Sequence, residues 1–202
     1  MARIDYQLIE DLVPDGATVL DLGCGDGGLL AELVEKKHVR GSGVDISQSA
    51  VEACVARGLS VFHADLDEGL ADHDDGSFDV VILSFSLQQL RRPRLVVREM
   101  ARVGRLVIVS FPNFAHWWAR SQLFFLGRMP VSAELPYQWY DTPNIHLCTV
   151  RDFRAVCQRE GLRVVREFYL HSFEKPAPRL RLPNLTARIA IFAIMRAFPP
   201  GG

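Results

Sequence analysis

The chain has 202 residues, and its 23 Lys and Arg against 24 Asp and Glu give a formal net charge of −1 at pH 7. This balance gives no electrostatic reason to expect binding to nucleic acid, and no apolar run reaches the roughly 18 residues that a membrane span needs. The four cysteines form no C-x-x-C pair and no zinc spacing, and the N-terminus lacks the apolar core of a signal peptide. We therefore expect a single domain over residues 1–202 of a cytoplasmic protein with reduced thiols.

The first elements lead into a glycine-rich turn. Residues 5–13 have the spacing of a short amphipathic helix, and the apolar, β-branched segment 17–22 predicts a buried strand. Gly23, Gly25 and Gly27 follow that strand directly, and an amphipathic helix comes next. A strand that turns into a helix through glycines brings backbone N–H groups to the edge of a parallel sheet, where a ligand can approach the main chain.

Two classes of ligand bind at such a turn. Gly23, Gly25 and Gly28 satisfy the dinucleotide pattern G-x-G-x-x-G. The segment from Asp21 to Gly27 also satisfies the acidic-x-G-x-G-x-G pattern of methyltransferases that use S-adenosylmethionine (SAM). A carboxylate beside the loop repels a pyrophosphate, whereas it suits SAM, which carries a sulfonium and an ammonium group. Asp21 therefore favours SAM over NAD, and a purely structural glycine turn is the remaining alternative.

Acidic residues end the next two predicted strands. The segment 41–47 closes on Asp45, whose carboxylate can accept both ribose hydroxyls of an adenosine, in SAM and NAD alike. The segment 59–66 carries Asp65, which can accept from an adenine amino group while Leu66 donates its backbone N–H. Because the carboxyl ends of parallel strands meet at one edge of a sheet, we expect these acids to lie close together.

Strand and helix continue to alternate. The apolar segment 78–84 predicts a central strand that is buried on both faces, with Ser84 and Phe85 at its ligand-binding end. A helix over about 93–103 and a fifth strand over 105–111 follow. Five such alternations predict an α/β fold with a doubly wound, mostly parallel sheet.

The alternation stops after the fifth strand, and we expect an aromatic-rich insertion over about 112–143. All three Trp and eight of the 19 aromatic residues lie between Phe114 and Tyr140. Aromatic residues at this place suit a lid over the sheet edge or a docking surface. A small satellite core that only holds the insertion together is the alternative.

For a methyl acceptor with a hydroxyl or amine group, one base helps the transfer. Four side chains in or beside the insertion are candidates for that base, and a structural role is the alternative for each: His116, Tyr140, Asp141 and His146. No metal-ligand cluster is found, so we assign neither a metal nor a catalytic residue.

The C-terminal part adds a helix and two strands. Thr149 is the expected N-cap of a helix over 150–160, and 162–170 predicts a sixth strand. The segment 189–195 suits either a helix or a fully buried strand. Its β-branched residues favour a strand, which would be the seventh.

By these residues the chain resembles the class I SAM-dependent methyltransferases, whose motifs it matches at 21–27, Asp45, Asp65 and from Ser84 onward. It is similar in more detail to the methionine biosynthesis protein MetW family, in the segments 112–117, 127–131 and 139–146. One departure is Phe85-Ser86, where that family more often has a Gln-Thr pair.

The resemblance implies a seven-stranded sheet with an antiparallel last strand, SAM or S-adenosylhomocysteine as ligand, and homoserine O-acyltransferase as protein partner. Together with the strand ends, it leads us to expect eleven cofactor-binding residues: Asp21, Gly23, Cys24, Gly25, Gly27, Asp45, Ile46, Asp65, Leu66, Ser84 and Phe85. An accessory protein of that acyltransferase is one function consistent with these features. A SAM-dependent methyltransferase with an unknown small-molecule acceptor is the second, and an NAD-dependent reductase is a third that Asp21 disfavours.

Overall fold

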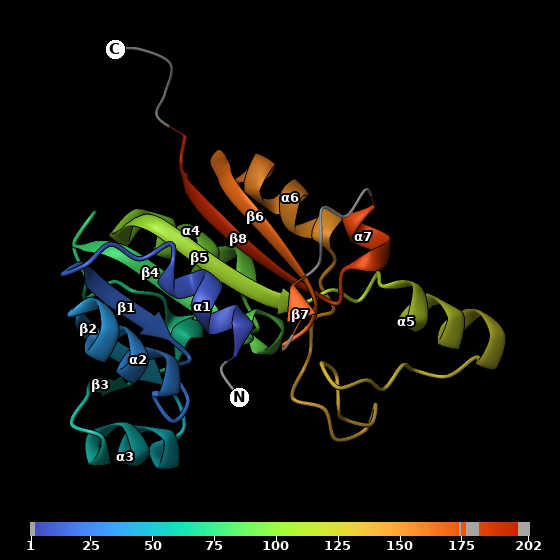
Figure 1. The fold of residues 1–202 in the computed structure, drawn as a ribbon, viewed down its shortest axis with the longest axis horizontal. Helices are drawn as coiled ribbons and strands as arrows, with labels where there is room; N and C mark the ends of the chain where they lie inside the picture. Colours follow the sequence, from blue (N-terminus) through green and yellow to red (C-terminus); the bar gives the residue numbers. More distant parts are fainter. Residues whose placement is uncertain (1–2, 174, 177–181, 198–202) are drawn as a thin grey trace.

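A mixed sheet in the order β3-β2-β1-β4-β5-β8-β6-β7 forms the centre of the molecule (Figure 1). The computed structural model describes residues 3–173, 175–176 and 182–197, so both extreme ends of the predicted domain lie outside the described residues. Five parallel strands make up the first part of the sheet: β1 (Thr18–Leu22), β2 (Arg40–Asp45), β3 (Ser60–His63), β4 (Phe78–Ser84) and β5 (Gly104–Pro112).

The second part of the sheet contains the antiparallel strand. β8 (Ile189–Arg196) runs antiparallel to β5 on one side and to β6 (Leu162–Ser172) on the other. The doubly wound, mostly parallel sheet with an antiparallel last strand is thus confirmed, and 189–195 is the strand rather than the helix. A two-residue strand, β7 (Lys175–Pro176), pairs with β6 and adds to the seven predicted strands.

Helices cover both faces of the sheet. The longer ones are α1 (Ile4–Glu10), α2 (Gly28–Lys37), α3 (Gln48–Ala56), α4 (Pro93–Val103) and α6 (Val150–Arg159). The expected N-cap of α6 is confirmed, since Thr149 Oγ1 accepts from the Asp152 N–H. Ser47 caps α3 in the same way, with its Oγ accepting from the Ala50 N–H. Short helical turns fill several connections: η1 (Leu66–Glu68), η2 (Leu87–Gln89), α5 (Trp117–Ser121), the π-helical η3 (Gln122–Leu126) and α7 (Pro183–Thr186).

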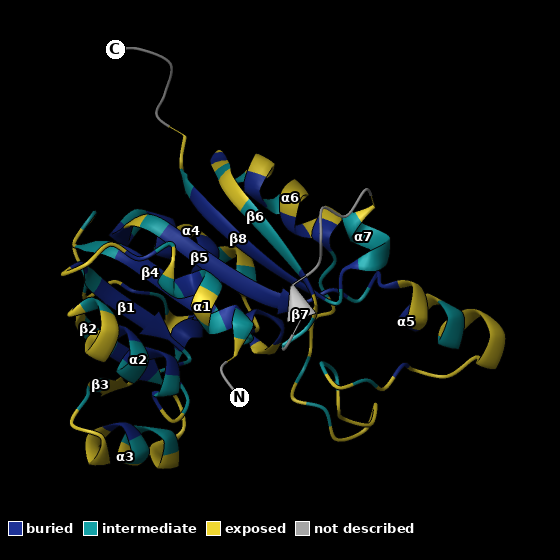
Figure 2. Cartoon of the chain, viewed as in Figure 1, coloured by how far each residue is buried: buried dark blue, intermediate teal, exposed yellow. Residues whose placement is uncertain are grey.

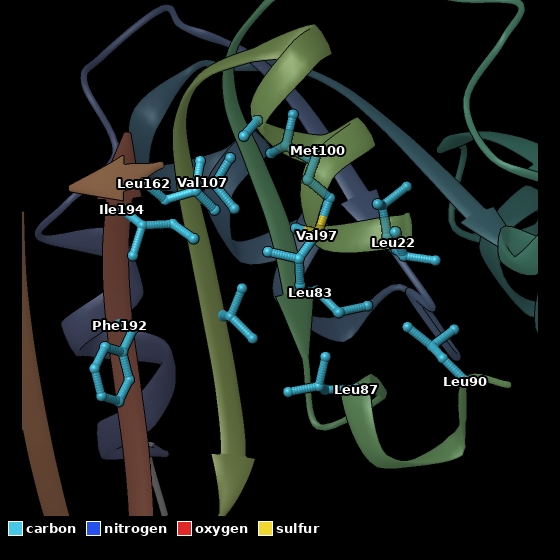
Figure 3. Packing of buried hydrophobic residues seen from close by; sticks show 14 of the residues in the cluster. Leu22, Leu83, Leu87, Leu90, Val97, Met100, Val107, Leu162, Phe192 and Ile194 are labelled. Carbon is cyan, nitrogen blue, oxygen red and sulfur yellow. The ribbon is translucent and has the colours of Figure 1, made fainter. Parts of the chain in front are cut away.

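The core has two halves because β4 and its neighbours are buried on both sides. Val80 and Ile82 pack in the cluster that contains side chains of α1 and α2. Val81 and Leu83 alternate with them and pack in the cluster of α4 and α6. Figure 3 shows this second cluster, in which Met100 of α4 lies among side chains of the strands.

The third strand is shorter than the predicted 59–66. β3 ends at His63, and Asp65 instead starts η1 by accepting a hydrogen bond from the Asp67 N–H at 2.9 Å. β3 is an edge strand in the sheet order, so its outer side has no ladder that would hold a longer strand. A local carboxylate–backbone bond therefore ends it early.

The insertion projects from the end of β5, away from the rest of the molecule (Figure 1). Its residues are mostly exposed or half-buried (Figure 2), and Phe124, Phe125 and Trp139 are 82%, 77% and 72% exposed. Asn113 holds its base, because the buried amide donates to the Ala187 carbonyl at 2.8 Å and accepts from the Val150 N–H. Because the rings of Phe124, Phe125 and Trp139 are largely exposed, a small satellite core does not account for them.

Candidate functional site

A cavity of about 340 Å³ opens at the carboxyl ends of β1 and β2, and we call it the acidic cleft. It lies beside the point where the chain order reverses, since β1 sits between β2 and β4, which is where open α/β sheets bind ligands. Five residues expected from the sequence line it: Gly23, Asp45, Ile46, Asp65 and Leu66. Five lining residues were not expected: Asp67, Ser86, Gln89, Leu90 and Arg91.

The three glycines of the turn have different reasons for lacking a side chain. A Cβ on Gly23 would lie 2.5 Å from Ser86 Oγ, and one on Gly27 would lie 2.5 Å from Leu59 Cδ1. A Cβ on Gly25 would meet no heavy atom within 4 Å. Gly23 and Gly27 therefore serve internal packing, whereas Gly25 presents its backbone to open space.

Asp45 fixes the shape of the glycine turn. Its carboxylate accepts from the Gly25 N–H at 2.8 Å and from the Ser47 N–H at 2.9 Å. The side chain is half-buried and lines the cleft, so its remaining lone pairs can accept from a ligand.

Asp21 lies beneath the turn and is 2% exposed. Burial, and next the negative charge of Asp45, raise the pKa of the Asp21 carboxyl to about 7. A positive group bound above the turn would favour the ionised form of Asp21. The ionisation of Asp21 would therefore respond to a charged ligand in the cleft, although its side chain does not line the cleft.

Asp65, Asp67 and Arg91 form an ion-pair network at the other end of the cleft. Arg91 Nη2 donates to Asp65 at 2.5 Å and Arg91 Nε to Asp67 at 3.3 Å. Burial acts to raise the pKa of Asp67, but hydrogen bonds from the Arg91 and Arg92 N–H groups outweigh it and lower that pKa. Arg91 belongs to no recognisable sequence motif, so the sequence gave no signal for its place here.

Ser84, Phe85 and Cys24 lie beside the cleft rather than in its lining. Phe85 has a φ of 57°, which turns its ring to within 5.1 Å of the Phe173 ring. Ser86 then faces the turn, and its Oγ donates to the Gly23 carbonyl at 3.4 Å. The Cys24 thiol is buried 3.8 Å from the Cys54 sulfur, and burial raises its pKa.

The four candidate bases are not brought together, and none of them lines the cleft. His116 caps α5 by accepting from the Trp118 N–H, and burial and then the Arg188 charge lower its pKa. Tyr140 and Asp141 are exposed on the insertion, and Tyr140 packs edge-on against Trp139. His146 lines a separate cavity between α4 and α6. Among the described residues, no group of three or more His, Cys, Asp or Glu could hold a metal ion, and no helix is long and apolar enough to cross a membrane.

The fold matches solved methyltransferase structures. A SAM-dependent methyltransferase from Mesorhizobium loti aligns with a TM-score of 0.70 over 95% of this chain and 97% of that one, at 18% identity. The [4+2]-cyclase SpnF aligns with a TM-score of 0.70 over 97% of this chain and 82% of its own, at 15% identity. The chain therefore has the Rossmann-like fold of class I SAM-dependent methyltransferases, and SpnF shows that this fold also serves other reactions.

Sequence similarity then gives the family. The model of the family described as "Methionine biosynthesis protein MetW" matches residues 3–194. The "Bifunctional methionine biosynthesis protein MetXA/MetW" of Rhodopirellula baltica is 34% identical over 205 residues, which is 96% of this chain and 33% of that protein. The chain belongs to the MetW family, and it spans only about a third of the length of this bifunctional relative.

Proposed function

We propose that the chain binds SAM or S-adenosylhomocysteine in the acidic cleft and acts in methionine biosynthesis as an accessory partner of homoserine O-acyltransferase. The family and the methyltransferase fold support a SAM-related role in methionine biosynthesis. The cofactor and the partner are proposals that rest on the two regions described next.

The cleft fits the shape and charge of SAM. Asp45 would accept from the ribose hydroxyls, Asp65 would accept from the adenine amino group, and the open face of Gly25 would leave space for the methionine part. SAM has a net positive charge, which suits a lining with three carboxylates and one arginine, and with Asp21 beneath it. When bound, SAM would supply a methyl group activated on a sulfonium.

The accessory role rests on the exposed aromatic residues of the insertion. We define the aromatic surface as Trp117, Trp118, Phe124, Phe125, Trp139 and Tyr140, each more than 40% exposed. Exposed aromatic residues in such number are typical of protein interaction sites. The bifunctional relative carries a MetXA part and a MetW part in one chain, which supports an acyltransferase as the partner.

A methyltransferase with an unknown acceptor is the alternative. The fold supports it, but none of the four candidate bases lines the cleft, so this function lacks an identified acid–base group there. Methyl transfer to a hydroxyl or amine is helped by such a group, whereas SAM binding by an accessory protein has no use for one.

An acyl-transfer assay tests the proposal. Homoserine O-acyltransferase is assayed alone, with this chain, and with this chain plus SAM, and association is measured in parallel by pull-down. We expect association and a changed acylation rate, and we expect the double substitution Phe124→Ser, Phe125→Ser to weaken both. Val55→Ser is the matched control, because Val55 is 61% exposed but lies on α3. No association and no change in rate would remove the accessory role, and methyl transfer to an extract component would favour the alternative.

A further inference from the structure

Ser86 and Gly23 lie next to each other in the lining of the acidic cleft. A Cβ built on Gly23 would be 2.5 Å from Ser86 Oγ, so the hydroxyl stands directly against the glycine turn. That hydroxyl is shared between two main-chain carbonyls, since Oγ lies 3.4 Å from the Gly23 oxygen and 3.2 Å from the Ser84 oxygen. Both distances exceed the roughly 2.5–3.0 Å that is usual for O–H···O hydrogen bonds, so the hydroxyl binds neither carbonyl tightly.

This end of the cleft has more hydrogen-bond acceptors than donors. Ser86 Oγ and the carbonyls of Gly23 and Ser84 are three acceptor oxygens, and the hydroxyl supplies one proton among them. The N–H groups beside them point elsewhere, because those of Gly23 and Cys24 donate to the Val44 carbonyl at 2.7 Å and 3.2 Å. A group with several N–H donors on one atom suits this arrangement, whereas a carboxylate or a phosphate does not.

The charges around these oxygens also favour a cation. The Asp45 carboxylate lines the cleft, and the Asp21 carboxyl is buried beneath the turn. Among the lining residues that the structure describes, Arg91 alone has a positively charged side chain, and it is paired with Asp65 and Asp67. The chain therefore supplies acceptors and negative charge here, and a bound ligand would supply the positive group.

We propose that Ser86 makes the acidic cleft specific for a ligand with a primary ammonium group. The ammonium donates to Ser86 Oγ and to the Gly23 and Ser84 carbonyls, while the hydroxyl keeps its own bond to one of these carbonyls. This inference rests on the proposed binding of SAM or S-adenosylhomocysteine, whose amino-acid part carries such a group, and it names the side chain that recognises it. A dinucleotide such as NAD has no ammonium group and leaves these oxygens without a donor.

Two ligands test this inference by calorimetry on the full chain. S-adenosylhomocysteine has the ammonium group but no sulfonium, and its desamino analogue has a hydrogen in place of the amino group. We expect Ser86→Ala to bind S-adenosylhomocysteine at least about tenfold more weakly than the unaltered chain, as for one hydrogen bond to a charged group. The affinity for the desamino analogue should change by less than about twofold, because that ligand makes no bond to the hydroxyl.

Ser60→Ala is the matched control, because Ser60 is exposed on β3 and does not line the cleft. This variant should bind both ligands as the unaltered chain does. The unaltered chain should itself prefer S-adenosylhomocysteine by at least about tenfold, and that comparison does not depend on any variant folding.

Three results would overturn the role of Ser86 and leave the proposed function standing. They are equal affinity of the unaltered chain for the two ligands, an equal loss for both ligands in Ser86→Ala, and unchanged binding of S-adenosylhomocysteine in that variant. An equal loss for both ligands would mean that the hydroxyl only supports the shape of the turn. No binding of S-adenosylhomocysteine to the unaltered chain would overturn the proposed cofactor, and this inference with it.

Discussion

The acidic cleft and the aromatic surface differ in how far their side chains are fixed before anything binds. In the cleft, Asp45, Asp65 and Asp67 each accept at least two hydrogen bonds from the chain itself. On the aromatic surface, Phe124 is 82% exposed, and its ring packs edge-on against Phe125 with the ring centroids 4.9 Å apart. The cleft is thus preorganised for a small polar ligand, which reduces the entropy lost on binding.

The aromatic surface gains most of its burial only when another molecule covers it. Burial of apolar surface contributes roughly 25 cal/mol per Å² removed from water. An isolated chain keeps these rings in water, so they add little to its own stability. Substitutions in the cleft should therefore weaken SAM binding, whereas substitutions on the aromatic surface should change neither SAM binding nor the stability of the isolated chain.

Gly25→Val should have the largest effect on ligand binding. A side chain here enters the open space above the turn, so we expect SAM affinity, measured by calorimetry, to fall by at least about a hundredfold. Gly161→Val is the matched control, because Gly161 also has a positive φ, of 65°, and also has no atom within 4 Å of a built Cβ. Both variants suffer the same backbone strain, but only the first should lose binding. Unchanged affinity in Gly25→Val would show that the ligand does not lie against the turn.

Asp21→Asn should remove one pH-dependent contribution to the stability of the folded chain. The pKa of Asp21 rises from 3.8 to about 7 on folding, so the folded state holds a proton that the unfolded state releases. The contribution of Asp21 to the stability of the unaltered chain should therefore fall as the pH rises from about 4 to 7, by at most about 4 kcal/mol. Asn cannot ionise, so the variant should lack this decline. Urea unfolding at pH 5 and pH 8 measures it, and a parallel decline in both proteins would exclude Asp21 as its source.

Asp45→Ala should weaken SAM binding by about 1.5–3 kcal/mol, the usual range for hydrogen bonds to a charged group. The ribose hydroxyls would lose the carboxylate that accepts from them, and the Gly25 N–H would lose its acceptor. Asp15→Ala serves as control, because the Asp15 side chain is 79% exposed in an ion pair with Lys37. Calorimetry compares the two, and a loss below about 0.5 kcal/mol in Asp45→Ala would place the ribose elsewhere.

The sequence predicts the scaffold of the cleft better than its details. Apolar, β-branched segments mark the strands. Acids near the ends of parallel strands meet because such strands finish at one edge of the sheet, and Asp45 and Asp65 accordingly line the same cleft. Phe85 is predicted to bind the cofactor, and its positive φ accompanies a ring contact with Phe173, while the next residue, Ser86, lines the cleft. Such a conformation is rare for a residue other than glycine and leaves no pattern in the sequence.

The remaining unexpected features depend on contacts between distant parts of the chain. Arg91 reaches Asp65, 26 positions away, only because η2 folds back beside η1. The four candidate bases were grouped because they are near one another in the sequence. Tyr140 and Asp141 are exposed and do not line the acidic cleft, which no local pattern of residues could indicate.

Phe124→Ser with Phe125→Ser should change the free energy of unfolding of the isolated chain by no more than about 0.5 kcal/mol, because exposed side chains contribute little to the folded state. Phe153→Ala, on the buried face of α6, should cost about 3–5 kcal/mol in the same urea titration. The double variant should also bind SAM with unaltered affinity, since neither residue lines the acidic cleft. A destabilisation close to that of Phe153→Ala would mean that the two rings hold the isolated chain together, and the aromatic surface would then lose its interpretation as a site kept for a partner.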